Sequence, residues 1–351
     1  MSPSFPDLPG LSDQEHPPSR PREAMTRVGI PRALFYYTYF PFWETFFTEL
    51  GAEVVVSEPT NKKILQDGLN VSSGELCLPI KLLHGHILDL RDRCDFVFLP
   101  YILSTQKGAY YCPKLIATPD IAKAVDPGLS LLSADVDMDN FFGSLFSTLR
   151  EVAAKLSTNP MRIYAAFRKA LERQEIFEGH VHGGAPFEEA LSGARAGRSR
   201  GNGAAGPAAG EGPVIAVIGH TYLFNDAYIS FDLLRRLRER GARVVTSDML
   251  GADQVDRTLS PLESTTHWSL GNRVIGAAIH YSRREDVDGI IYITPFGCSS
   301  DSLIKEYIDA NLPRKTPMLI LTVDEHSGDA GVVTRIEAFF DMIARKPGRA
   351  G

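Results

Sequence analysis

Short, continuously apolar runs alternate with longer helical patterns in two blocks of this chain, and this alternation constrains the fold more than any other feature. Strands that are covered on both faces of a parallel sheet are apolar throughout, whereas the helices between them are amphipathic. The 351 residues are enough for about two domains. We therefore predict an α/β protein with two doubly wound, Rossmann-like lobes and a cleft between them.

The predicted strands and helices follow one another in regular order. The strands are expected at residues 28–30, 54–56, 96–99, 214–218, 243–246, 289–293 and 318–321. The helices are expected at residues 40–50, 60–69, 79–91, 113–125, 226–240, 272–284, 300–310 and 332–345, with one or two more within 140–177. In sheets of this kind, ligands bind beyond the carboxyl ends of the strands.

Two segments lack the composition of a packed core. The first 25 residues hold six prolines, which predicts a disordered tail, and Met25 stands directly before the first strand as an alternative start. Around residues 191–213 bulky apolar side chains are almost absent, which predicts a Gly/Ala-rich linker. The expected order is a tail at 1–25, an α/β lobe at 26–135, a helical segment at 136–190, the linker at 191–213 and a second α/β lobe at 214–346.

Charge and hydropathy exclude several classes of partner. The chain has 37 Lys+Arg against 43 Asp+Glu, a net charge of −6, and it has no long basic run. This composition predicts no binding to nucleic acid or to an anionic membrane. No stretch approaches the ~18 continuous apolar residues of a membrane span, and the first residues lack the pattern of a secretory signal. We expect a cytoplasmic protein.

Three of the four cysteines precede predicted helix starts. Cys298 follows the strand at 289–293, Cys112 comes directly before Pro113, and Cys77 stands just before the helix at 79–91. Thiolates and anionic clusters are stabilised at helix amino termini, where free N–H groups and the helix dipole point at the ligand. Cys94 instead begins the strand at 96–99 and is expected at the opposite edge of the sheet, as a structural residue.

These three cysteines admit two interpretations. In one, they are unrelated core or loop residues. In the other, they form one metal site assembled from both lobes, because their spacing matches neither the paired C-x-x-C of structural zinc nor the compact ferredoxin pattern. Three thiolates leave one coordination position open, as catalytic metal sites do, and zinc is an alternative metal for the same ligands.

Four stretches of the chain carry a family resemblance. They read IPRALFYYTYFPFWETFFTELGAEVVVSEPTNKKIL, ELCLPIKLLHGHILDL, DGIIYITPFGCSSDSLI and VDEHSGDAGVVTRIEAFFDM. They resemble the acyl-CoA dehydratase activase-related proteins, which are relatives of the iron–sulfur subunits of 2-hydroxyacyl-CoA dehydratases and of double-cubane cluster proteins. The resemblance covers about residues 27–124 and 213–345.

The resemblance implies an iron–sulfur protein with one 4Fe-4S cluster held by Cys77, Cys112 and Cys298. It also implies an ATP-dependent activase partner, low-potential electron transfer to an acyl-CoA substrate, reductive elimination of water, and a homodimer or heterodimer. Double-cubane proteins need six cysteines, so this chain is expected to hold a single cluster unless two subunits share one. The sequence has no Walker-type G-x-x-x-x-G-K-[ST] loop, and ATP hydrolysis is therefore expected in a partner or in a segment absent here.

Further candidate site residues are predicted from their positions at strand ends or near a cysteine. His220 and Tyr222 come after the strand at 214–218, Glu325 comes after the strand at 318–321, and Glu75 precedes Cys77. Each is a candidate for substrate contact or proton transfer at a strand end or beside the cysteines.

Several other residues have two interpretations each. Lys81 and Lys114 lie in the first turns after Cys77 and Cys112, where they either compensate an anionic cluster or are simply solvated. His84 and His86 diverge on one helix and cannot both bind one ligand, although one of them could reach the cluster's surroundings. The aromatic segment at 35–47 is expected to be lobe core.

The sequence is compatible with three functions. The first is an enzyme, or an enzyme subunit of lyase or reductase type, whose cluster lies between two lobes. The second is a non-catalytic electron-relay or activase-docking module. The third is a bilobed binder of small molecules in which the cysteines are incidental.

Overall fold

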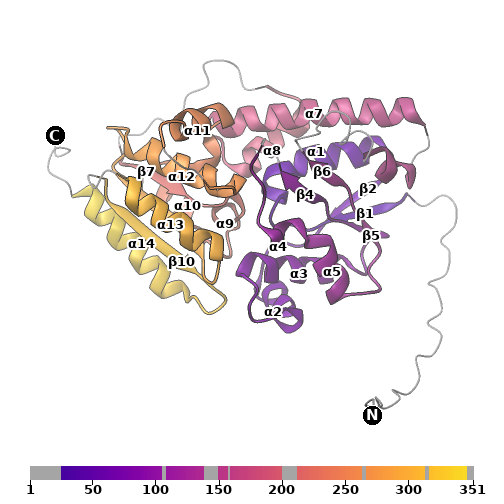
Figure 1. Cartoon of the computed structure of the whole chain (residues 1–351), viewed down its shortest axis with the longest axis horizontal. Coiled ribbons are helices and arrows are strands. Elements are labelled where there is room, and N and C mark those ends of the chain that lie inside the picture. Colours follow the sequence, from indigo (N-terminus) through magenta and orange to yellow (C-terminus); the bar gives the residue numbers. More distant parts are fainter. Residues whose placement is uncertain are drawn as a thin grey trace, which may run out of the picture.

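The computed structural model describes residues 25–104, 108–137, 149–156, 159–199, 212–262, 266–312 and 316–345. They form two α/β lobes that lie side by side, as Figure 1 shows in purple and in orange to yellow. The predicted fold class is confirmed. The tail predicted at 1–25 lies outside the described residues except for Met25, as do residues 200–211 of the predicted linker.

The N-terminal lobe contains a four-stranded sheet in the order β2-β1-β3-β5, in which all neighbouring strands are parallel. A separate parallel pair, β4 and β6, extends the lobe, and the apolar pattern had not revealed it. The elements are β1 (Arg27–Ile30), α1 (Tyr36–Glu49), β2 (Glu53–Val56), α2 (Lys62–Val71), α3 (Leu78–Leu90), β3 (Phe96–Phe98), β4 (Tyr101–Ser104), α4 (Pro113–Ile116), α5 (Thr118–Val125), β5 (Leu131–Leu132) and β6 (Asp135–Asp137).

The C-terminal lobe contains a second four-stranded parallel sheet in the order β10-β9-β7-β8. The two central strands, β7 and β9, are buried along their whole length, as continuous apolar runs predict. The elements are β7 (Val214–Ile218), α9 (Thr221–Asn225), α10 (Leu233–Glu239), β8 (Arg243–Thr246), η2 (Ser247–Met249), α11 (Ala252–Leu259), α12 (Ser269–Ser282), β9 (Gly289–Pro295), α13 (Ser299–Asn311), β10 (Met318–Val323) and α14 (Asp329–Ala344).

Two helices connect the lobes along one side of the molecule. The long helix α7 (Pro160–His182) packs on α1 and runs across the top of Figure 1, and α8 (Phe187–Ala196) packs against α7. Helix α8 overlaps the beginning of the linker predicted at 191–213. Leu191 and Ala194 are buried, and α8 ends only where Gly197 adopts a φ of 64°. Residues 138–148 and 157–158 of the predicted helical segment lie outside the described residues.

Two predicted helices are shorter than the pattern indicated. The helix expected at 113–125 is divided into α4 and α5, because Pro119 cannot donate the backbone hydrogen bond that would continue α4. The helix expected at 226–240 begins only at Leu233. Phe231 and Asp232 have φ values of 54° and 55°, which no helix accepts.

Helix α3 belongs to the cores of both lobes. On one side, Ile80, Leu83 and Ile87 join the N-terminal core. On the other side, Leu78 and Leu82 join the apolar cluster of the C-terminal sheet. Each fully buried leucine stabilises the fold by about 1.5–3 kcal/mol. The helix is thus fixed between the lobes, and with it the residue that precedes it, Cys77. None of the helices in the described ranges is long and apolar enough to cross a membrane.

Two glycines let α2 approach α3 closely. A Cβ atom at Gly85 would lie 1.9 Å from the carbonyl oxygen of Ile64, and one at Gly68 would lie 2.0 Å from that of Lys81. Both neighbours are helix backbone, which cannot move aside without shifting a whole helix.

We expect Gly85→Ala to lower the free energy of unfolding by about 1–3 kcal/mol, the usual cost of overpacking. Gly179→Ala is the matched control, because Gly179 lies within α7 and a Cβ there meets nothing within 4 Å. Alanine there should stabilise the helix by up to about 1 kcal/mol. Chemical denaturation of both variants checks this, and equal effects of the same sign would contradict the close packing of α2 on α3.

Candidate functional site

Three cysteines occupy the same structural position at the starts of three helices. Cys77, Cys112 and Cys298 are the N-cap residues of α3, α4 and α13. The prediction that each precedes a helix is therefore confirmed. Pro79 and Pro113 follow within the first two helical positions, where a missing N–H costs nothing.

All three cysteines line one small cavity between the lobes. The cavity has a volume of about 30 Å³, and none of the three forms a disulfide. The fold thus brings together three cysteines that are far apart in the chain. The other lining residues come from both lobes: Pro79, Ile80, Lys114, Leu115, His220, Tyr222, Trp268, Leu270, Gly271, Ser300 and Ile304.

The three cysteines are partly buried. Burial raises the pKa of the Cys77 thiol, and the amide of Ile80 and the charge of Lys114 oppose this effect. Burial and the nearby Asp301 raise the pKa of Cys298 to about 11, although the Ser300 hydroxyl, 3.2 Å from its Sγ, acts in the opposite direction. Without a bound metal, these two thiols are therefore protonated at neutral pH. A metal that binds them must displace their protons.

The thiols of the cavity suit a metal centre, but the volume of the cavity is too small for an iron–sulfur cluster. Three thiols suit soft or borderline metals and iron–sulfur clusters. As the side chains stand, however, no three His, Cys, Asp or Glu residues in the described part of the chain are arranged to hold one ion. A cavity of about 30 Å³ also holds only one or two water molecules. The residues fit a three-thiolate centre by chemistry, and the cavity must widen to admit it.

A buried histidine–aspartate pair lies at the edge of this cavity. Nε2 of His220 is 2.8 Å from Oδ1 of Asp301, and Oδ2 of Asp301 accepts a hydrogen bond of 3.0 Å from Thr294. Oδ1 of Asp301 is placed to accept a hydrogen bond from the His220 tautomer that carries its proton on Nε2. Nδ1 of His220 is buried and has no partner among the described residues. The pair can therefore hold or receive a proton at Nδ1.

Tyr222 lies next to this pair. Its ring stacks on His220 with ring centres 5.3 Å apart. Burial, Asp301 and the three thiols raise its pKa well above the ordinary value, so the phenol keeps its proton at neutral pH. His220 and Tyr222, both predicted from their position after a strand, are thus brought together with the cysteines.

Asp301 was not predicted as a site residue. It lies in the first turn of α13, and the sequence presents it as an ordinary acidic helix cap. In the folded chain, His220 follows the end of β7 and bonds Asp301, which makes Asp301 part of the site. Trp268 lines the same cavity and carried no signal in the sequence.

The two predicted lysines have different environments. Lys114 lines the cavity and donates a hydrogen bond of 3.1 Å to the carbonyl oxygen of Glu75. Lys81 is buried and binds Glu325 at 2.5 Å, with 6% and 19% of the two side chains exposed. This ion pair joins α3 to the loop after β10. The structure thus places Glu325 in a contact between the lobes, and the side chain of Glu75 is exposed.

The other candidates lie away from the cavity. His84 bonds Ser72 at 2.7 Å, and His86 bonds Ser57 at 2.9 Å and Thr60 at 3.0 Å. Neither histidine lines the cavity.

Cys94 also lies outside the cavity and packs against Gly29, where a Cβ atom would come within 2.6 Å of its Sγ. Its thiol contacts the carbonyl oxygen of Leu90 at 3.2 Å. The structure thus separates Cys94 from the other three cysteines, and Cys94 serves as their internal control.

Comparison with known proteins identifies the family. Residues 27–250 match the model of a family described as CoA enzyme activase uncharacterised domain (DUF2229). The chain belongs to this family. No curated protein matches it.

The DUF2229 match covers only part of the cavity. Cys77, Cys112, His220 and Tyr222 lie within the matched residues, whereas Cys298 and Asp301 come after residue 250. The assignment of Cys298 to the same site therefore depends on the structure of this chain and not on the DUF2229 match.

The ion pair between Lys81 and Glu325 makes a testable contribution to stability. Burial favours the neutral form of Glu325, but the hydrogen bond and charge of Lys81 outweigh burial and lower its pKa. A lowered folded-state pKa stabilises the protein above the ordinary value of 4.5, and this stabilisation is lost as the pH falls through the folded-state value.

We expect Glu325→Gln to lower the free energy of unfolding by about 3 kcal/mol at pH 7, because the buried Lys81 loses its counter-charge. The difference from wild type should shrink below pH 4.5. Glu306→Gln is the control, since Glu306 is 74% exposed and 3.8 Å from Lys305, and such pairs contribute about 0–1 kcal/mol. Denaturation curves over a range of pH measure both. A cost that does not change with pH would contradict the ion pair.

Proposed function

We propose that this chain is an iron–sulfur protein that holds one 4Fe-4S cluster through Cys77, Cys112 and Cys298 in the cleft between its lobes. The observation that carries the proposal is that these three distant cysteines, each at a helix N-cap, line the same cavity. The cluster would supply low-potential electrons for reductive, dehydratase-like chemistry. The alternative is a non-catalytic electron relay or a module that docks an activase.

The electrostatic surroundings support an anionic centre. The backbone N–H of Ile80 in α3 lies near the thiol of Cys77, and that of Asp301 in α13 lies near the thiol of Cys298, so both helix starts favour a negative charge there. Lys114 adds a positive charge beside Cys77. Three thiolates leave a fourth position for substrate, as open metal sites do.

His220, Asp301 and Tyr222 are proposed to handle protons beside this fourth position. Asp301 fixes the tautomer and orientation of His220, so that Nδ1 is the atom that takes or gives a proton. Tyr222 retains its proton and can donate a hydrogen bond through it. This arrangement favours a catalytic role over a pure relay, since a relay needs no buried proton carrier.

Entry of the cluster is proposed to widen the cavity between the lobes. Both α3 and the pair of Lys81 with Glu325 connect the lobes. The widening therefore has to come from side chains at the cavity wall or from a movement of one lobe against α3.

The partners follow from the family resemblance and remain proposals. We propose an ATP-dependent activase as electron donor, an acyl-CoA substrate, a homodimer or heterodimer, and a cytoplasmic location. The name of the matched family associates it with CoA enzyme activases.

The first test is the metal content of protein reconstituted with iron and sulfide without oxygen. We expect about four irons per chain in the wild type, the content of one 4Fe-4S cluster. Cys77→Ser, Cys112→Ser and Cys298→Ser should each lose the cluster, because each removes a thiolate ligand. The matched control Cys94→Ser should retain it, since Cys94 lies outside the cavity. Iron analysis and the electron paramagnetic resonance signal after reduction measure this.

Three results would contradict the proposal. They are a colourless, iron-free protein after reconstitution, bound zinc in place of iron, and loss of the cluster in Cys94→Ser alone. If the cluster is present but its spectrum does not respond to any acyl-CoA, the electron-relay alternative is favoured.

The second test separates a proton-handling residue from a metal ligand. Nε2 of His220 is bonded to Asp301, so we expect His220→Gln to keep the same iron content as the wild type. His326→Gln, which changes an exposed histidine in another loop, is the control. If His220→Gln loses the metal while His326→Gln keeps it, His220 is the fourth ligand and the position open to substrate does not exist.

A further inference from the structure

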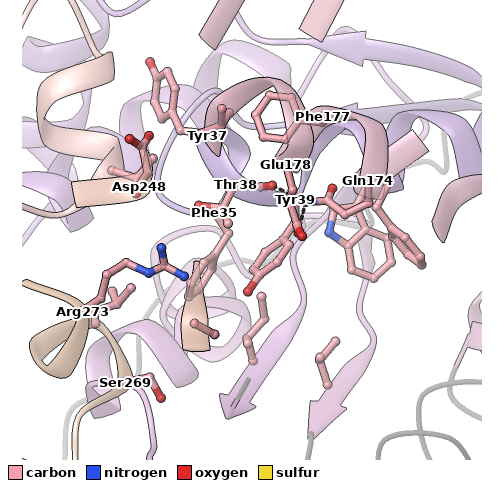
Figure 2. Close-up of a pocket in the computed structure, with 18 of the residues that line it drawn as sticks. Phe35, Tyr37, Thr38, Tyr39, Gln174, Phe177, Glu178, Asp248, Ser269 and Arg273 are labelled. Carbon is pink, nitrogen blue, oxygen red and sulfur yellow. Dashed lines mark hydrogen bonds between the residues drawn. The ribbon is translucent and has the colours of Figure 1, made fainter. Parts of the chain in front are cut away.

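A second, much larger cavity lies between the lobes, next to the cysteines. Its volume is about 430 Å³, within the range of small-molecule sites. Helices α1 and α7 form one wall, and the C-terminal lobe supplies Thr221, Asp248, Ala252 and the start of α12. We call this cavity the aromatic chamber. Figure 2 shows Arg273 reaching across it from the C-terminal lobe toward Phe35.

Aromatic rings dominate the interior of the aromatic chamber. They come from the segment predicted to be lobe core, and from α7 and the loop before α4. Part of that segment, including Phe40, Phe46 and Phe47, is fully buried in the core as expected, whereas other members face the chamber. The rings at the chamber include Phe35, Phe42, Trp43, Tyr111 and Phe177. Such a lining favours a flat, apolar ligand.

Two buried polar atoms of the chamber walls have no partner. Gln174 is 8% exposed and donates from Nε2 to the carbonyl of Thr38 at 2.8 Å and to Glu178 at 2.9 Å (Figure 2). Its Oε1 has no hydrogen-bond partner among the described residues, and neither has Nε1 of Trp43, which is 6% exposed. Unsatisfied buried groups are costly. A ligand with one donor and one acceptor could satisfy both.

The charges around the aromatic chamber disfavour anions. The positive charge of Arg273 interacts with the carboxyl group of Asp248. Arg273 also donates a hydrogen bond of 3.0 Å to the carbonyl oxygen of Leu250. Glu175 and Glu178 are exposed lining residues and mark where the chamber meets solvent. The four charges sum to a negative value at neutral pH. A carboxylate or phosphate entering past the two glutamates is repelled.

We propose that the aromatic chamber binds a small, uncharged molecule that carries an aromatic ring and a polar group able to donate and accept a hydrogen bond. Leu270 lines both cavities, and Thr221 of the chamber stands between His220 and Tyr222 of the cysteine cavity. A bound molecule would thus be separated from the cysteine cavity by Leu270. Its role as substrate or product rests on the proposed function, but its binding does not.

The two tryptophans of the chain make this testable, because each belongs to a different cavity. Trp43 lines the aromatic chamber and Trp268 lines the cysteine cavity. In the full chain with Trp268→Phe, tryptophan fluorescence comes from Trp43 and reports on the aromatic chamber alone. In the full chain with Trp43→Phe, it reports on the cysteine cavity.

The probes are 3-phenylpropionamide, 3-phenylpropionate and 3-phenylpropylamine, which share a ring and differ in charge. We expect the amide to change Trp43 emission saturably and to leave Trp268 emission unchanged. The carboxylate should bind at least about tenfold more weakly than the amide. The amine carries a positive charge in place of the negative charge of the carboxylate. It should therefore bind no more weakly than the carboxylate.

Removing the charges at the mouth should relax this selectivity. In the Trp268→Phe background, Glu175→Gln with Glu178→Gln should strengthen carboxylate binding by about fivefold or more. Glu172→Gln is the matched control, since Glu172 is an exposed residue of the same helix outside the chamber lining, and should leave it unchanged.

Each other outcome overturns the proposal. If none of the probes binds, the chamber is not a ligand site. A response from Trp268 alone moves the ligand to the cysteine cavity, and equal binding of amide and carboxylate removes the charge selection. Iron content measured on the same samples keeps this result separate from a failure of the cluster proposal.

Discussion

The burial of α3 on two sides is the constraint on which the rest of the structure depends. Leu78 and Leu82 belong to the apolar cluster of the C-terminal sheet, while Ile80 and Leu83 belong to the N-terminal core. Every residue from Leu78 to Ile87 is buried, so the helix is enclosed on all sides, and each lobe encloses one of them. The position of Cys77 at its start is therefore set by both lobes together.

The site arises because helix starts from both lobes meet at this point. Cys112 and Cys298 cap helices that follow a loop or a strand end, and His220 follows β7. Elements of this fold class place their functional groups at such positions as a rule. The particular feature of this chain is that three of these positions carry a thiol, and that a paired histidine and aspartate lie beside them.

Much of this arrangement could be predicted from the sequence, for reasons that differ between elements. Strands such as β7 and β9 were visible because full burial makes them continuously apolar. Cys77 and Cys112 were visible because Pro79 and Pro113 mark helix starts, and Cys298 because it follows a predicted strand.

Features that depend on tertiary contacts were not visible. The positive φ at Phe231 and Asp232, the role of Asp301 and the aromatic chamber have no local signature. Each depends on groups that only the folded chain brings together. The close contact of α2 and α3 through Gly68 and Gly85 is of the same kind.

Two neighbouring cavities of contrasting chemistry, one lined by thiols and one by aromatic rings, lie between the lobes of this member of the DUF2229 family. The proposed function depends on the ligands of a single inorganic centre. The most direct measurement is diffraction from crystals of the reconstituted protein at the iron absorption edge. We expect one compact peak of anomalous scattering between the lobes, within iron–sulfur bonding distance of Sγ of Cys77, Cys112 and Cys298. Iron bound elsewhere, or a peak that lacks any of these three sulfur atoms, would contradict it.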